Sequence, residues 1–106
     1  MPDLFASVPT ADFAAGRAWW ERFFGREPDL LPNDHEAAWR VTAEGWIYVN
    51  GDAGRAGTAL LTLLVDDLDG WIERLSLDAA AIETMPGGIR TLMVTDPEGN
   101  TIQLGG

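Results

Sequence analysis

The sequence contains no cysteine, so it has no disulfide, no thiolate metal site and no thiol nucleophile. Histidine occurs once, as His35, and the only serines are Ser7 and Ser76. Their spacing does not match any arrangement in which a histidine activates a serine. No catalytic residue is therefore assigned from the sequence.

Long apolar runs are missing as well. The longest, residues 59–65, is interrupted by Thr62 and is far too short to span a bilayer. The first residues lack the basic segment and apolar stretch of a secretion signal. We therefore expect a cytoplasmic protein that does not enter a membrane.

Basic residues are few: 17 acidic side chains face 7 basic ones, which gives a formal charge of −10. Such a field repels nucleic acid and anionic membrane surfaces and attracts cations. We expect neither a nucleic acid nor a membrane as partner, and the charge favours a cationic ligand. Solubility alone also accounts for an acidic surface.

The length of 106 residues, 46% of them hydrophobic, fits a single domain with one modest core. Apolar runs and turn residues divide the chain into two halves with the same order of elements. The first half has a strand at 4–8 that ends at Pro9, a helix at 13–24 capped by Thr10 or Asp12, a possible strand at 27–31, and strands at 35–42 and 46–50. The second has a strand at 58–65, a helix from Asp67 to about Leu75, and strands at 81–85, 89–95 and 101–104.

The two halves match each other as an internal repeat. Two of the four matches are offset by 55 residues, one by 53, and the helical segment by 52. The pairs, in chain order, are Asp12 with Asp67, residues 19–23 with 71–75, Val41 with Val94, and Ile47 with Ile102. We interpret the chain as α+β: two tandem βαβββ modules forming a curved mixed sheet with a concave cup and helices on the outer face. Module one spans about 1–51, a glycine-rich linker about 51–57, and module two about 58–106.

Two segments carry a resemblance to a known family. The sequence DPEGNTIQL at 96–104 resembles the closing motif of the vicinal oxygen chelate superfamily, which includes glyoxalase I, extradiol dioxygenases, and fosfomycin and bleomycin resistance proteins. The sequence VPTADF at 8–13, which runs into WWERFFG at 19–25, is similar to the family's first strand and helix. The resemblance covers essentially the whole chain.

The resemblance also implies where a metal would be held. Metal-using members take ligands, usually histidine and glutamate, from one position on the first and one on the last strand of each module. In this chain those positions hold Phe5, Tyr48, Leu60 and Gln103, none of which offers an imidazole or a carboxylate. His35 between Asp34 and Glu36 is read as a solvated loop. We therefore expect no metal and no cofactor.

The resemblance implies that these four side chains point into the cup, and strand alternation then adds aromatic and hydrogen-bonding neighbours on the same face. Such a mixture is typical of a pocket for a flat organic ligand, although simple packing or a dimer contact also explains it. The candidate ligand-binding residues are Phe5, Ser7, Arg40, Trp46, Tyr48, Leu60, Thr62, Met93, Thr101 and Gln103.

We interpret the protein as a metal-independent binder of the glyoxalase/bleomycin-resistance type that sequesters a cationic or amphipathic aromatic compound, with antibiotic resistance as the implied role. The resemblance also implies a homodimer. Two alternatives stay open at this point. One is a glyoxalase- or dioxygenase-like lyase or isomerase with unconventional metal ligands, and the other is a regulatory module that uses the open face only to dimerise. Whether the protein is an enzyme is left undecided.

Overall fold

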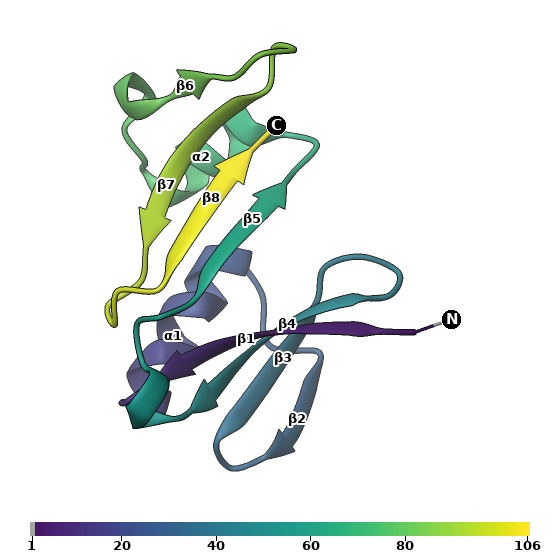
Figure 1. Cartoon of the computed structure of the whole chain (residues 1–106). Helices are drawn as coiled ribbons and strands as arrows, with labels where there is room; N and C mark the ends of the chain where they lie inside the picture. Colours follow the sequence, from purple (N-terminus) through teal and green to yellow (C-terminus); the bar gives the residue numbers. More distant parts are fainter. Residues whose placement is uncertain (1) are drawn as a thin grey trace.

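The computed structural model describes residues 2–106 and contains two successive βαβββ modules, as the repeat predicts (Figure 1). The first comprises β1 (Leu4–Thr10), α1 (Phe13–Phe24), β2 (Leu30–Asn33), β3 (Glu36–Arg40) and β4 (Gly45–Gly51). The second comprises β5 (Leu60–Leu64), α2 (Leu68–Leu75), β6 (Glu83–Thr84), β7 (Arg90–Thr95) and β8 (Thr101–Gly105). Short 3-10 turns lie at Ala53–Arg55 and Ala79–Ala81.

Each module forms a four-stranded mixed sheet, in the orders β1-β4-β3-β2 and β5-β8-β7-β6. In each, the first strand runs parallel to the last, and the other pairs are antiparallel. The repeat holds at the level of single residues, since Phe5 lies opposite Trp46 and Leu60 opposite Thr101. The two sheets have separate strand pairing, so one curved sheet with a cup across both modules stays a prediction.

Both helices have an aspartate as N-cap residue. The Asp12 carboxylate accepts the N–H of Ala15 at 3.1 Å, and the Asp67 carboxylate accepts the N–H of Gly70 at 3.0 Å. An aspartate at this position satisfies a backbone donor that the helix leaves unpaired. Helix α1 ends at Gly25, whose φ of 72° is readily adopted only by glycine. Helix α2 has 8 residues and α1 has 12. Since α2 is shorter, residues near the two helix ends match at an offset of 52 rather than 55.

The two modules share their apolar core. Large buried side chains come from α1 (Trp20 and Phe23), from the first sheet (Trp39) and from the second sheet (Ile102 and Leu104). In Figure 1 α2 lies behind the second sheet and α1 lies below it, and the rings of Phe23 and Trp71 on the two helices are 5.2 Å apart. Neither module encloses its apolar residues alone, so the halves depend on each other for stability.

The closing motif at 96–100 forms a polar connection between the modules. The Asp96 carboxylate, only 4% exposed, accepts the indole N–H of Trp20 at 3.1 Å and the side-chain N–H of Asn100 at 2.9 Å. Asn100 in turn donates to the carbonyl of Pro9 at 2.9 Å and accepts the N–H of Ala59 at 3.0 Å. We call these groups the inter-module clasp. The residues that carry the family resemblance at this end of the chain therefore have a structural role.

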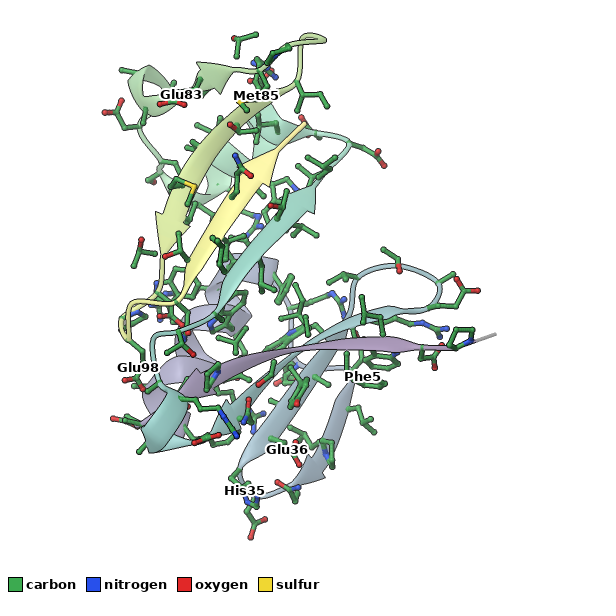
Figure 2. The ribbon with its side chains drawn as sticks, in the orientation of Figure 1. Phe5, His35, Glu36, Glu83, Met85 and Glu98 are labelled. Carbon is green, nitrogen blue, oxygen red and sulfur yellow. The ribbon has the colours of Figure 1, made fainter. Side chains whose placement is uncertain are left out.

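Two further contacts join the modules at the ends of α1. Glu98, labelled in Figure 2, accepts the N–H groups of Ala11 and Asp12 just before the helix. At the other end, the Arg74 guanidinium donates to the carbonyls of Arg22 and Phe23 at 2.8 and 2.7 Å. A cation is favourable where helix carbonyls lack partners.

Three expected boundaries are wrong. Strand β1 continues through Pro9 to Thr10, because an edge strand tolerates a proline on its unpaired side. Of the segment 81–85 only Glu83 and Thr84 form a strand, β6, because Ala81 ends a 3-10 turn at 79–81 that Asp78 caps, and alanine runs form strands poorly. The strand expected at 27–31 begins only at Leu30.

Within residues 2–106 no helix has the length and apolarity needed to cross a membrane.

Candidate functional site

Each sheet has one face against its helix and one face that the helix does not cover, which we call the open face. In β4 the alternate residues Ile47 and Val49 are 5% and 0% exposed, whereas Trp46 and Tyr48, on the open face, are half-buried. Phe5 on β1 is 47% exposed. The period-two alternation therefore separates core from surface as the sequence predicts.

An aromatic stack crosses the first open face. Phe5, Trp46 and Arg40 are in register on the neighbouring strands β1, β4 and β3, so Phe5 and Arg40 flank the indole. The Phe5 ring is 5.4 Å from Trp46 and nearly parallel to it, and the Arg40 guanidinium lies 5.6 Å from the same indole. Phe5 also meets Tyr48 edge-on at 6.2 Å. Each neighbour restricts the motion of the next, so the stack is preorganised.

The indole N–H of Trp46 is buried and has no hydrogen-bond partner, the one such side-chain group in the described part of the chain. Buried donors of this kind in native proteins are usually paired with an acceptor from ordered water or a bound molecule. The described residues themselves therefore leave this donor unsatisfied.

One polar side-chain pair lies on each open face, and the two donors, Ser7 and Thr62, occupy positions that the repeat relates. Ser7 donates its hydroxyl to the Asn50 side chain at 2.6 Å, and Thr62 donates to the Gln103 side chain at 3.1 Å. The remaining residues of the second open face are less polar, since Leu60 is 71% and Met93 56% exposed. The first open face is thus aromatic and the second mainly aliphatic.

A hollow of about 350 Å³ lies on the first open face, and we call it the first hollow. Of the ten residues expected to bind ligand, Phe5 and Tyr48 line it. Figure 2 labels Phe5 and Glu36 at this sheet. The sequence analysis missed four other lining residues: Leu30, Pro32, Glu36 and Ala38.

Glu36 and Ala38 had a signal in the sequence. Arg40 was placed on the open face by alternation, and counting back by two along the same strand reaches Ala38 and then Glu36. Glu36 was instead grouped with the loop at His35. The Glu36 carboxylate accepts the side-chain N–H of Asn33 and otherwise faces the hollow.

The other expected residues lie elsewhere. Ser7, Trp46 and Arg40 are on the first sheet beside the first hollow without lining it. Five belong to the second sheet, which does not border this hollow: Leu60, Thr62, Met93, Thr101 and Gln103. One chain therefore does not gather the ten residues around the first hollow.

The donor groups present do not fit the metal that some families with this fold bind. Phe5, Tyr48, Leu60 and Gln103 have no imidazole or carboxylate, and divalent ions need several such groups together. In residues 2–106 no three histidine, aspartate or glutamate side chains lie close enough to share an ion. His35 is exposed, and its backbone N–H donates to Asn33 at 3.0 Å.

Comparisons with known proteins agree with this fold. Residues 4–104 match the family model of the Glyoxalase/Bleomycin resistance protein/Dioxygenase superfamily. No curated protein sequence matches the chain. A crystal structure of a glyoxalase/bleomycin resistance protein from Catenulispora acidiphila is similar, with a TM-score of 0.89 and 35% identity over 99% of this chain and 97% of that one.

Two more distant structures show the same fold. A lactoylglutathione lyase from Agrobacterium tumefaciens has a TM-score of 0.72 and 18% identity, covering 96% of this chain and 90% of that chain. A bleomycin-binding protein in complex with bleomycin has a TM-score of 0.71 and 16% identity, covering 99% and 96%. At such identities the likeness concerns the fold alone.

Proposed function

The chain belongs to the glyoxalase/bleomycin resistance protein/dioxygenase superfamily, and we propose that within it this protein binds a cationic, amphipathic small molecule without a metal. The observation that carries the proposal is the first hollow. Its walls are the rings of Phe5 and Tyr48 and the aliphatic Leu30 and Pro32, and Glu36 supplies one carboxylate. One negative charge among apolar walls suits a ligand with one positive charge on an apolar body.

Three physical effects act in the same direction. Each aromatic face attracts a cation by about 0.5–2 kcal/mol, depending on how far the cation is desolvated. The Glu36 carboxylate adds an ionic contact at the edge of the hollow. The net charge of −10 steers cations toward the protein before they bind.

The absence of suitable donors at the family's metal positions supports a metal-independent mode. The alternative of a lyase or isomerase would need ligands from elsewhere, and the described residues bring no cluster of them together. We therefore favour a binding protein, like the bleomycin-binding protein whose fold it shares.

Replacing Glu36 with glutamine tests the charge in the first hollow. We expect Glu36→Gln to weaken binding of bleomycin and of benzyltrimethylammonium about tenfold, which corresponds to about 1.4 kcal/mol. Binding of a neutral aromatic alcohol of similar size should be unchanged. Titrations followed by tryptophan fluorescence measure both. Asp34→Asn removes the same charge from an exposed turn nearby and should not change the affinity for either cation. If the native protein binds neither cation, the proposal is wrong.

We also propose that two copies associate through the edge strands β1 and β5. Each has one edge without a strand partner in the described structure, and each carries exposed leucines, Leu4 at 72% and Leu60 at 71%. Open apolar edges are ready templates for pairing with another chain. Such a dimer would place the aliphatic open face of one copy near the aromatic open face of the other.

Sedimentation equilibrium tests this association. The native protein should have twice the 11.5 kDa mass of one chain, and Leu4→Lys should shift it to the monomer, because a charged side chain on an edge opposes pairing. Ala14→Lys, on the exposed side of α1, should leave the dimer intact. A native protein that sediments as a monomer at micromolar concentration contradicts the proposal.

A further inference from the structure

A second and larger hollow, of about 390 Å³, lies between the two modules. Its lining comes from the end of α1, the end of β3, the end of β5 and the start of α2. We call it the inter-module hollow. It shares no lining residue with the first hollow. Arg40 lines the inter-module hollow and Phe5 lines the first hollow, and these two side chains flank the Trp46 indole from neighbouring strands.

One side of the inter-module hollow is positively charged. Arg26 and Arg40 line it, and they are two of only 7 basic residues in a chain of net charge −10. Arg26 is held by two contacts, to the Asp29 carboxylate at 2.5 Å and to the Arg40 carbonyl at 2.7 Å. Arg40 is fixed by the Ala43 carbonyl and by Trp46. Two restrained guanidinium groups with spare N–H donors suit a carboxylate.

The Arg26 contact persists across the physiological pH range. The hydrogen bond from the Arg26 side chain, and then that from the backbone N–H of Arg40, lower the pKa of Asp29 below its ordinary value. Asp29 is therefore ionised at neutral pH and keeps Arg26 in place.

Module two contributes negative charge to the inter-module hollow, whereas both arginines belong to module one. Asp66 and Asp67 line it. Asp67 caps α2, whereas the exposed Asp66 carboxylate has no hydrogen-bond or ion-pair partner among residues 2–106. The hollow is also lined by the apolar side chains of Phe24, Trp71 and Leu64, the last 58% exposed. The hollow thus presents positive, apolar and negative groups in one space.

From this arrangement we infer that the inter-module hollow binds a zwitterionic amphipathic molecule of dipeptide size. Its carboxylate contacts Arg26 and Arg40, its ammonium contacts Asp66, and an apolar side chain packs on Phe24 and Trp71. Complementary charges at both ends fix the orientation of the molecule and disfavour ligands that carry only one charge. This site is independent of the proposed cation site, since Glu36 and Tyr48 do not border it.

Calorimetric titration with three probes tests the inference: the dipeptide leucylphenylalanine, its N-acetylated form, which keeps only the negative charge, and its amide, which keeps only the positive charge. The free dipeptide should bind at least tenfold more tightly than either blocked form. Asp66→Asn should weaken the free dipeptide about tenfold and leave the acetylated form unchanged. Arg26→Gln should weaken the free dipeptide similarly and leave the amide unchanged.

Matched controls separate this site from general charge effects and from misfolding. Arg55→Gln and Asp34→Asn remove the same charges at exposed positions away from the hollow and should not alter dipeptide binding. Both site variants should still bind benzyltrimethylammonium as the native protein does.

Three results would overturn the inference. One is equal binding of the three probes, and another is competition between the dipeptide and benzyltrimethylammonium. The third is no dipeptide binding together with a changed dimer dissociation constant in Asp66→Asn, which would make this hollow a contact between copies of the chain.

Discussion

Replacing Asp96 with asparagine is expected to lower the free energy of unfolding by about 3 kcal/mol, a large part of the 5–15 kcal/mol typical of a domain. The asparagine has the same shape, but each oxygen of Asp96 accepts two N–H groups: those of the Trp20 and Asn100 side chains at one oxygen, and those of the Glu98 and Asn100 backbone at the other. The N–H₂ group of asparagine would therefore face two donors in either orientation. Two buried donors then lose a charged acceptor, and this loss is what makes the change costly. Urea unfolding followed by tryptophan fluorescence should show a lower midpoint with an unchanged slope.

Two variants check that the inter-module clasp is responsible. Asp34→Asn changes the same group at an exposed turn and should alter stability by no more than about 0.5 kcal/mol. Trp20→Phe removes one of the donors, and combining it with Asp96→Asn should cost less than the sum of the two single changes. A loss below about 1 kcal/mol for Asp96→Asn would show that the clasp does not hold the modules together.

The second large effect is expected in ligand binding. Replacing Phe5 and Tyr48 together with alanine should weaken binding of benzyltrimethylammonium about 100-fold, or about 2.7 kcal/mol. Both rings line the first hollow, and each contributes an aromatic face for the cation together with apolar area that the ligand covers. Binding is measured by calorimetry, because the fluorescence of Trp46 will itself change when Phe5 is removed.

This double variant should fold normally, since Phe5 is 47% exposed and Tyr48 only half-buried. Circular dichroism and the urea midpoint verify that it does. Leu31→Ala, which removes an apolar side chain that is 53% exposed on the neighbouring β2, should leave affinity unchanged. If the double variant loses less than threefold in affinity, the cation binds somewhere other than the first hollow.

The residues that line the first hollow could be predicted only where alternation along a strand decides the face. That rule placed Phe5 and Tyr48 correctly on the open face and, carried two steps further from Arg40, would have reached Glu36. No such rule covers Leu30 and Pro32, because the start of β2 depends on how a proline-containing loop packs. Nor did alternation show that Arg26 and Asp66, 40 residues apart, border the same hollow.

By itself the sequence determined the order of elements, the two modules and their offset of 55 residues. These follow from local patterns: apolar periodicity, an aspartate before each helix and a glycine after α1. Only the tertiary structure decided how the modules join, because Asp96 meets Trp20 across 76 residues of chain and Arg74 meets Phe23 across 51. The same holds for the two hollows. Their walls come from segments that are far apart in the sequence, and no local pattern encodes that these segments lie together.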